Sequence, residues 1–345
     1  MPVAGQESSS SREVTPVPLQ ADDWIELQTT LDAGLRFLAR SQQSASGAVG
    51  SQYPVAVTSL AGMAALGAGY LPTQGRHGEF LHRCVRYLRT VADSRPDRFI
   101  TETGEAASRM HGHCYAVLFM AQVAGSLRAE EEAQAVALIR SGVRVIRAAQ
   151  SREGGWYYAA DNAADEDEAS VTVCALQALR AARNIGIAVD SFTRDQAIRY
   201  VKRCQLPSGA FCYALRERSK STYALTVAAL STLNAAGVYE SEELRKGKEW
   251  VRHALEREGA DKWDAAGEEF PYYANFYAAQ FLYQEGGPLW REWYASVRDH
   301  LMKTKKTRGE QNEVYWESRY GDEYGTAMAL LILEVPLAYL PIFQR

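Results

Sequence analysis

The sequence predicts an all-α protein whose six helical hairpins close into an (α/α)6 toroid. Two observations lead to this fold class. A Gln-x3-Gly-x-aromatic pattern occurs at residues 150–156, again at 205–211, and in a weaker form at 43–49. Around these copies, helices with one polar face alternate with helices that are apolar all round. A repeat of about 50 residues indicates a repeat architecture, and no segment shows the period-two alternation of a half-buried strand.

Each hairpin is predicted to pair an outer, half-wet helix with an inner, buried one. The first outer helix starts near Trp24, and Leu31, Leu35 and Leu38 fall on one of its faces. The other outer helices are predicted at 80–91, 130–149, 193–203, 243–256 and 290–303. The inner helices are predicted at 55–70, 113–124, 170–182, 223–236, 272–283 and 324–335. A helix that is apolar all round must be covered on every side.

The apolar character of the last hairpin favours a closed ring over an open α-solenoid. An open solenoid normally ends in capping repeats with polar outer faces. Here the final inner helix is as apolar as the middle ones, and the apolar pattern continues through residues 335–343. We therefore expect the C-terminal segment to close the ring.

Length and composition suit one soluble globular body. A chain of 345 residues suggests about two domains by length alone, but stacked repeats can form one, so 23–345 is predicted as a single toroid domain. The net charge of −4 argues against nucleic acid as a partner. No apolar run reaches the length of a transmembrane segment.

The chain start and the cysteines predict a cytoplasmic location. Residues 1–22 lack the features of a signal peptide and are rich in Ser, Pro and Gln, so we expect a disordered N-terminal tail. The five cysteines are odd in number and lack Cys-x2-Cys spacing. Reduced thiols, most of them inside helical patterns, are the expected state.

The recurring pattern has a predicted structural role at the junction of outer and inner helices. Gly154 and Gly209 suit the left-handed conformation that commonly ends helices. Gln150 and Gln205 are expected to hydrogen-bond helix ends and tie neighbouring units together. Trp156 and Phe211 are expected to pack near the inner helix.

These elements resemble the prenyltransferase and squalene-oxidase repeat, over about residues 23–345. Squalene–hopene cyclases, protein prenyltransferase β subunits and complement-type thioester domains share that repeat, so the resemblance implies the toroid fold but no one chemistry. The zinc site of the prenyltransferases lacks its Asp-x-Cys context here, and no Gly-Cys-Gly-Glu-Gln thioester run is present. Neither a metal nor a cofactor is predicted.

Class II terpene cyclases carry Asp-x-Asp-Asp, and Asp165-Glu166-Asp167-Glu168 is similar except for its last residue. By this resemblance Asp167 is the general acid that protonates an alkene or epoxide, with Asp165 and Glu168 as carboxylate neighbours. Clustered carboxylates in a dry site favour one protonated member. The alternative is a solvated loop whose charges favour the start of the next helix.

Further candidates for ligand contact lie on the predicted inner helices. A carbocation in the ring would need aromatic faces around it, and His113 is placed beside the acidic run, within reach of Asp167. For His113 the alternative is a structural histidine bonded to a loop carbonyl; for the aromatic residues it is the core. Residues 216–220 and 303–306 are predicted as solvated charged loops. The candidate substrate-binding residues are His113, Tyr115, Phe119, Tyr223, Tyr273 and Tyr277.

Three functions stay open from the sequence. The first is an isoprenoid- or lipid-handling toroid, cyclase-like if Asp167 is its acid. The second is a non-catalytic toroid that binds a protein or peptide, with a filled centre. The third is a carbohydrate-active enzyme with two carboxylates roughly 5 to 9.5 Å apart in an open polar cleft.

Overall fold

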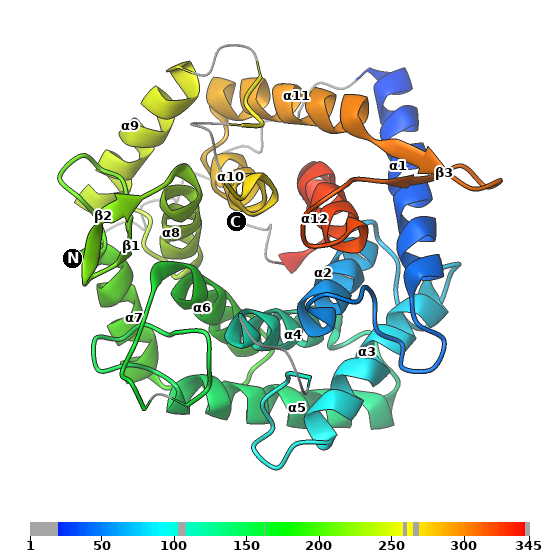
Figure 1. Ribbon diagram of the computed structural model, residues 1–345, viewed down its shortest axis with the longest axis horizontal. Coiled ribbons are helices and arrows are strands. Elements are labelled where there is room, and N and C mark those ends of the chain that lie inside the picture. The colour runs from blue at the N-terminus through cyan, green and yellow to red at the C-terminus, as the bar shows by residue number, and fades with distance from the viewer. Residues whose placement is uncertain (1–19, 103–107, 162, 258–260, 265–268, 342–345) are drawn as a thin grey trace, which may run out of the picture.

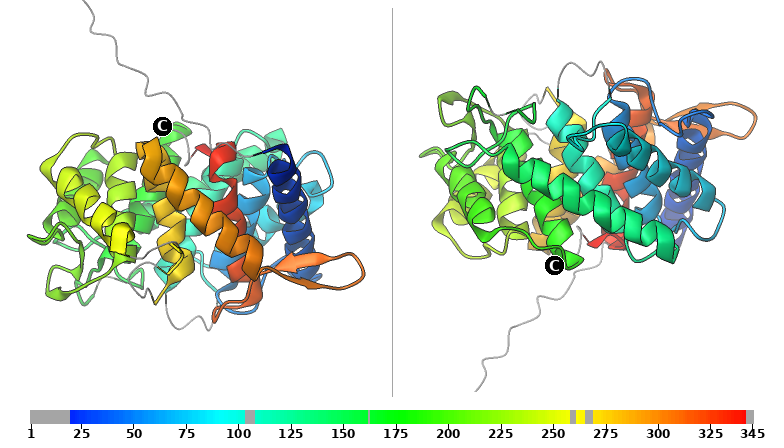
Figure 2. Two further views of the ribbon diagram at one scale, coloured as in Figure 1. Left: turned by 90° about the horizontal axis from the view of Figure 1, so that it is seen from above. Right: turned by 90° about the horizontal axis from the view of Figure 1, so that it is seen from below.

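The computed structural model describes residues 20–102, 108–161, 163–257, 261–264 and 269–341, and these form a ring of helices around helices (Figure 1). The inner helices are α2 (Pro54–Gly67), α4 (Arg109–Val123), α6 (Ala169–Asn184), α8 (Tyr223–Ala235), α10 (Pro271–Glu285) and α12 (Asp322–Glu334). The outer helices are α1 (Ala21–Ser41), α3 (Gly78–Asp93), α5 (Ala129–Ala148), α7 (Ser191–Arg203), α9 (Glu242–Arg257) and α11 (Gly287–Thr304). The predicted all-α toroid of six hairpins is confirmed. Side views show the outer helices crossing the inner ones at a steep angle (Figure 2).

Burial explains the alternation. In α2 every residue except Ala56 is buried, whereas α3 buries Cys84, Val85 and Leu88 on one side. The opposite side of α3 carries Arg86, which is exposed. The inner layer therefore separates a central space from the outer layer, and the outer layer separates the core from water. All five cysteines are buried free thiols, as expected.

The ring closes where the first and last hairpins meet. Inner helix α12 packs against α2, and outer helix α1 packs against α12. The rings of Phe37 and Tyr315 stack with centroids 5.4 Å apart. Arg40 forms an ion pair of 2.7 Å with Glu313, which is buried in strand β4 (Glu313–Tyr315). This seam confirms the predicted ring closure.

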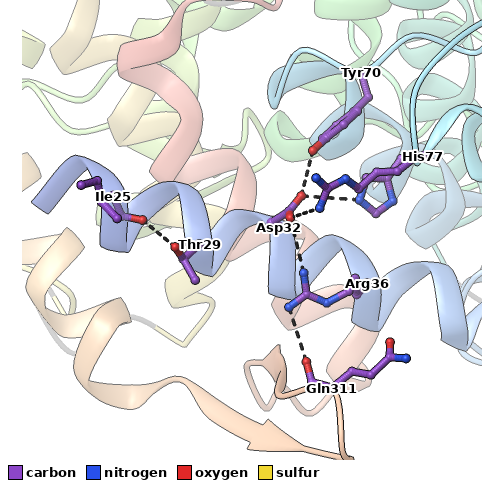
Figure 3. A network of polar contacts seen from close by, with 8 residues as sticks. Ile25, Thr29, Asp32, Arg36, Tyr70, His77 and Gln311 are labelled. Atoms are coloured by element: carbon purple, nitrogen blue, oxygen red, sulfur yellow. Dashed lines mark hydrogen bonds and ion pairs between the residues drawn. The ribbon is translucent and has the colours of Figure 1, made fainter. Parts of the chain in front are cut away.

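A polar network on α1 continues the seam (Figure 3). Asp32 accepts a hydrogen bond of 2.8 Å from the Tyr70 hydroxyl and pairs with Arg76, both from the α2–α3 connection. It also pairs with Arg36, which donates to the carbonyl of Gln311 in the last hairpin. One aspartate on α1 thus links segments from both ends of the ring.

Two short β-hairpins differ from the sequence prediction, which held no strands. β1 (Cys212–Ala214) pairs with β2 (Glu217–Ser221), and β3 (Lys306–Arg308) pairs with β4, both antiparallel. The charged segments 216–220 and 303–306 are therefore partly strand instead of plain loops. Every residue of β2 and β3 is exposed, so these strands have no buried face and no alternation that the sequence could reveal.

The N-terminal boundary also differs slightly. Helix α1 begins at Ala21, inside the predicted tail of residues 1–22, because Asp22 and Asp23 stabilise its first turn. Residues 1–19 of that tail lie outside the described part of the chain. A short 3-10 helix (Val335–Leu337) follows α12. Within the described residues, no helix combines the length and hydrophobicity needed to cross a bilayer.

The glutamines of the recurring pattern join one unit to the next. The Gln150 side chain donates 2.9 Å hydrogen bonds to the carbonyls of Gly154 and Thr193, the latter in the next outer helix. The Gln205 side chain does the same with Gly209 and Glu243. Gly154 has φ +99°, and a Cβ there would lie 2.6 Å from the carbonyl oxygen of Gln196. Both the backbone conformation and the close approach therefore require glycine.

In the first unit, Gln42 and not the predicted Gln43 takes this role. The Gln42 side chain is buried and donates to the carbonyls of Gly47 and Phe80, at 2.9 and 3.2 Å. Gln43 is exposed, and its side chain donates to Gly50. The loop here has one more residue between glutamine and glycine, which shifts the pattern by one position.

This difference gives a matched pair of variants. We expect Gln42→Ala to lower the free energy of unfolding by about 1 to 3 kcal/mol, because it removes two buried hydrogen bonds and leaves the Gly47 carbonyl without its side-chain donor. Gln43→Ala should change it by less than about 0.5 kcal/mol, as an exposed substitution. Denaturant unfolding of both variants measures this, and equal effects would show that Gln42 does not join the first two units.

Candidate functional site

A cavity of about 570 Å³ lies at the N-terminal end of the inner helices. All six inner helices contribute to its wall from their first two turns or from the residues just before them. Because the inner helices run parallel, their N-termini share this end of the ring. The inner-helix and capping residues in the wall are Tyr53, Ala56, Val57, Leu60, Ser108, His111, Tyr115, Ser170, Thr222, Tyr223, Ala224, Leu225, Phe270, Tyr273 and Tyr324.

Aromatic side chains dominate this wall. The aromatic lining residues are Tyr53, Tyr115, Tyr158, Tyr213, Tyr223, Trp250, Phe270, Tyr273, Tyr320 and Tyr324. Several contact one another: Tyr320 packs edge-on against Tyr53 and Tyr324, and its ring stacks on Phe270. Such a wall offers ring faces and apolar area to a ligand, with hydroxyl groups at intervals.

Few charges reach the cavity. Among the described lining residues, the charged side chains are Lys220 and Glu269. The Lys220 ammonium lies 4.5 Å from the centre of the Tyr213 ring, and Glu269 pairs with Arg319 at 3.3 Å. Glu269 is the only carboxylate that the described lining contains.

The structure brings half of the predicted binding residues to the cavity. Tyr115, Tyr223 and Tyr273 line it. Phe119 and Tyr277 are fully buried away from the lining, and Phe119 packs against Gly62 of the neighbouring inner helix. These two residues belong to the core, which was the alternative that the sequence left open.

His113 is also a structural residue. Its Nδ1 atom accepts a 3.0 Å hydrogen bond from the backbone N–H of Ile100, and its Nε2 atom donates to the carbonyl of Gly142 at 3.1 Å. Burial lowers the pKa of His113 to about 4, so the ring is neutral. The expected contact between His113 and Asp167 is not made, because both ring nitrogens are already occupied.

Two of the three predicted catalytic carboxylates point away from the cavity. Asp165 pairs with Arg152 at 2.5 Å, and hydrogen bonds from Arg152 lower the pKa of Asp165. Asp167 is buried and accepts a 2.7 Å hydrogen bond from the Ser151 hydroxyl, within the Gln-Gly loop. Neither residue lines the cavity. Asp167 therefore packs within the Gln-Gly loop and does not contact the space where a ligand would bind.

Glu168 is the carboxylate that connects to the cavity. It caps helix α6 by accepting hydrogen bonds from the N–H groups of Ser170 and Val171, at 2.7 and 2.6 Å. It also accepts the Ser170 hydroxyl at 2.9 Å. That hydroxyl lies 3.1 Å from Nε2 of His111, and both Ser170 and His111 line the cavity. A hydrogen-bonded chain thus runs from a fully buried carboxyl to the cavity wall.

The protonation of this chain follows from its burial. Desolvation raises the pKa of Glu168 to about 7, although its three hydrogen bonds act in the opposite direction. Desolvation lowers the pKa of His111 to about 4, so its ring is neutral. When Ser170 donates to Glu168, its oxygen accepts from Nε2–H of His111. Glu168 can therefore gain or lose a proton near neutral pH beside a neutral histidine.

Sequence reasoning chose His113 from the run His111-Gly112-His113 and did not single out Ser170. His111 stands two residues before His113 and four before Tyr115, so it shares the cavity-facing side of α4 with Tyr115. That spacing was the available signal. Tyr158 and Tyr213, whose hydroxyls are 2.8 Å apart, come from connecting segments and had no periodic signal at all.

No protein-family model matches the sequence, and no match is found among the curated proteins. The solved structure of the GH76A α-1,6-mannanase from Salegentibacter sp. HEL1_6 is similar, with a TM-score of 0.65 and 9% identity over 91% of this chain and 99% of the mannanase. An inactive variant of that enzyme, with two aspartates replaced by asparagine, has been solved with α-1,6-mannotriose. A protein from Actinoplanes gives a TM-score of 0.54 at 13% identity, over 91% of this chain and 99% of that one.

A type II terpene cyclase from Scytonema gives a TM-score of 0.37 at 14% identity, over 92% of this chain and 99% of the cyclase. At such low identities the mannanase and the Actinoplanes protein support the α/α toroid fold of this chain and nothing finer.

Proposed function

We propose that this protein binds an isoprenoid or a similarly apolar small molecule in the aromatic cavity at the N-terminal end of its inner helices. The observation that carries the proposal is the composition of the wall, in which ten aromatic side chains surround about 570 Å³. That volume falls within the roughly 300 to 1,000 Å³ of typical ligand pockets. A filled centre, as expected of a toroid that only binds a protein partner, is not what the cavity suggests.

The same site has a group suited to proton transfer. In place of Asp167, the role of acid or base is proposed for Glu168, acting through Ser170 and His111. A group whose pKa lies near the working pH is the most effective proton donor or acceptor. The aromatic faces would stabilise positive charge that forms on an apolar ligand after protonation. This is the cyclase-like form of the proposal.

Carbohydrate processing is the second candidate, and the fold shared with a mannanase favours it. Glycoside hydrolysis normally uses two carboxylates flanking the bond. Glu269 is the only carboxylate in the described lining. The sequence contains one pair of adjacent aspartates, Asp22 and Asp23, but they lie in the first turn of outer helix α1 and do not line the cavity. The isoprenoid proposal needs no second carboxylate, so we rank it first.

Filling the cavity tests the proposal. Ala56 lines the cavity and is the one residue of α2 that is not buried, and we expect Ala56→Trp to weaken the binding of geranylgeraniol at least about tenfold by taking up ligand space. Fluorescence titration of the tyrosine-rich wall measures this, and native mass spectrometry checks for a co-purified apolar ligand.

The matched control is Ala137→Trp, at an exposed alanine of outer helix α5. It should bind geranylgeraniol like the parent protein. Saturable binding of mannotriose but not of geranylgeraniol would replace the first candidate with the second. Binding of neither probe would remove both.

A further inference from the structure

A second hollow, of about 220 Å³, lies on the outside of the ring between α5, the end of α6 and the start of α7. Three arginines of α5, Arg140, Arg144 and Arg147, form one wall of it. Their spacing of four and then three residues puts them on one face of the helix. All three are exposed, so their guanidinium groups are open to solvent at the rim.

These arginines have no partners of their own. None of the three makes a hydrogen bond or ion pair with another described residue, whereas several cations of other outer helices do. On α9, for example, Arg245 and Lys246 both pair with Glu242, and Arg252 pairs with Glu256. On α3, Arg86 pairs with Glu79. In a chain with a net charge of −4, three unpaired arginines around one hollow are a local concentration of positive charge.

The one acidic residue in the described lining of the hollow, Asp190, already has hydrogen-bond donors. Asp190 caps helix α7 and accepts hydrogen bonds from the backbone N–H and the hydroxyl of Thr193, at 3.1 and 3.0 Å. Those bonds, and to a smaller extent the charge of Arg147, lower the pKa of Asp190. One carboxylate held by a helix start therefore faces three guanidinium groups, which leaves a positive excess.

The floor of the hollow is apolar and formed by buried side chains. Val143, Leu179 and Ile187 are buried there, on α5, α6 and the connection that follows. Arg183 stands one turn after Leu179, on the same face of α6, and adds a further exposed cation near the rim. Arginines that serve only to keep a helix face in contact with water do not require an apolar hollow beside them.

We propose that this hollow binds a phosphate monoester or diphosphate group. The planar guanidinium presents N–H donors in a fork that matches phosphate oxygens, and three forks on one wall suit a doubly charged anion. A volume of about 220 Å³ holds one such group, with room for a small apolar portion over the floor. The phosphate belongs either to a soluble metabolite or to a lipid headgroup. This site is separate from the aromatic cavity and does not depend on the function proposed for it.

The test uses the full chain with two triple variants of equal charge change. The hollow variant is Arg140→Gln/Arg144→Gln/Arg147→Gln, and the control is Arg245→Gln/Lys246→Gln/Arg252→Gln on α9. Inorganic pyrophosphate, measured by calorimetric titration, probes the soluble source. Phosphatidylcholine vesicles with and without phosphatidic acid, measured by co-sedimentation, probe the lipid source. Thermal unfolding confirms that both variants are folded.

We expect the parent and the control to bind one of these probes saturably, and the hollow variant to bind it at least about tenfold more weakly. Pyrophosphate binding identifies a soluble ligand, and binding to phosphatidic acid vesicles alone identifies a lipid headgroup. If the parent binds neither probe, or if both triple variants lose binding equally, the hollow is not a phosphate site.

Discussion

Trp156→Ala should lower the free energy of unfolding by about 3 to 5 kcal/mol, the usual range for truncating a buried tryptophan. Trp156 is completely buried at the junction of α5 and α6. Its indole N–H donates a 2.6 Å hydrogen bond to the carbonyl of Ile146, and its backbone N–H donates to the Thr172 hydroxyl at 3.0 Å. The truncation removes ring packing and the indole hydrogen bond, and the Ile146 carbonyl keeps only the 3.3 Å hydrogen bond from the backbone N–H of Ala149. Denaturant unfolding monitored by circular dichroism measures the loss.

The control is Trp156→Phe, which keeps most of the ring volume and loses the indole N–H. It should cost about 0.5 to 1.5 kcal/mol, as expected for the loss of one hydrogen bond. Phe211 holds the corresponding place in the next unit, where its backbone N–H donates to the Thr226 hydroxyl. A phenylalanine is therefore compatible with the geometry of this junction. Unchanged stability of Trp156→Ala would show that the aromatic residue of the pattern does not hold the units together.

The layered fold was predictable because the burial of a helix determines which of its positions are apolar, and that pattern can be read from the sequence. An inner helix such as α8 has no polar face to place against water, and each outer helix has one. Predicted helix ends lie within a few residues of the observed ones. The exposed hairpin strands were missed since they have no buried side. The choice between Gln42 and Gln43 was missed because it depends on the length of one loop.

The cavity was less predictable, because it depends on where each side chain points. His111 and His113 are two residues apart on one helix, so they point to different sides. One lines the cavity, and the other is sealed between Ile100 and Gly142. The sequence shows two histidines on one helix, and only their positions around the axis of α4 determine which of them lines the cavity.

In the acidic run of residues 165–168, too, the sequence does not show which way each side chain points. Glu168 has φ −153° and ψ 163°, so consecutive side chains point to opposite sides of the backbone here. Asp167 consequently faces Ser151 in the Gln-Gly loop, and Glu168 faces Ser170 and the cavity wall. The acid proposed above, Glu168, is therefore the residue after Asp167, the acid that the resemblance to the terpene cyclase motif implies.

Glu168→Gln should change how the stability of the protein depends on pH. The pKa of Glu168 is about 7 in the folded protein and about 4.5 in the unfolded chain, so the folded state holds a proton that the unfolded state releases between these values. Stability contributed by this group is complete below pH 4.5 and is lost as the pH rises towards 7. At about 1.36 kcal/mol for each pH unit, the loss is on the order of 3 kcal/mol. Glutamine does not titrate, so the variant should lack this decline.

The measurement is the free energy of unfolding of the parent and of Glu168→Gln across pH 4.5 to 8. The control is Glu166→Gln, which removes a half-buried carboxylate two residues away that pairs with Arg216 at 3.2 Å. Because the parent and Glu168→Gln share every other titrating group, the parent should lose stability relative to Glu168→Gln as the pH rises to 7. The difference between the parent and Glu166→Gln should stay nearly constant. Parallel curves for the parent and Glu168→Gln would mean that Glu168 ionises at its ordinary pH. It would then be a simple helix cap, and the proton would have to reach the cavity from another residue.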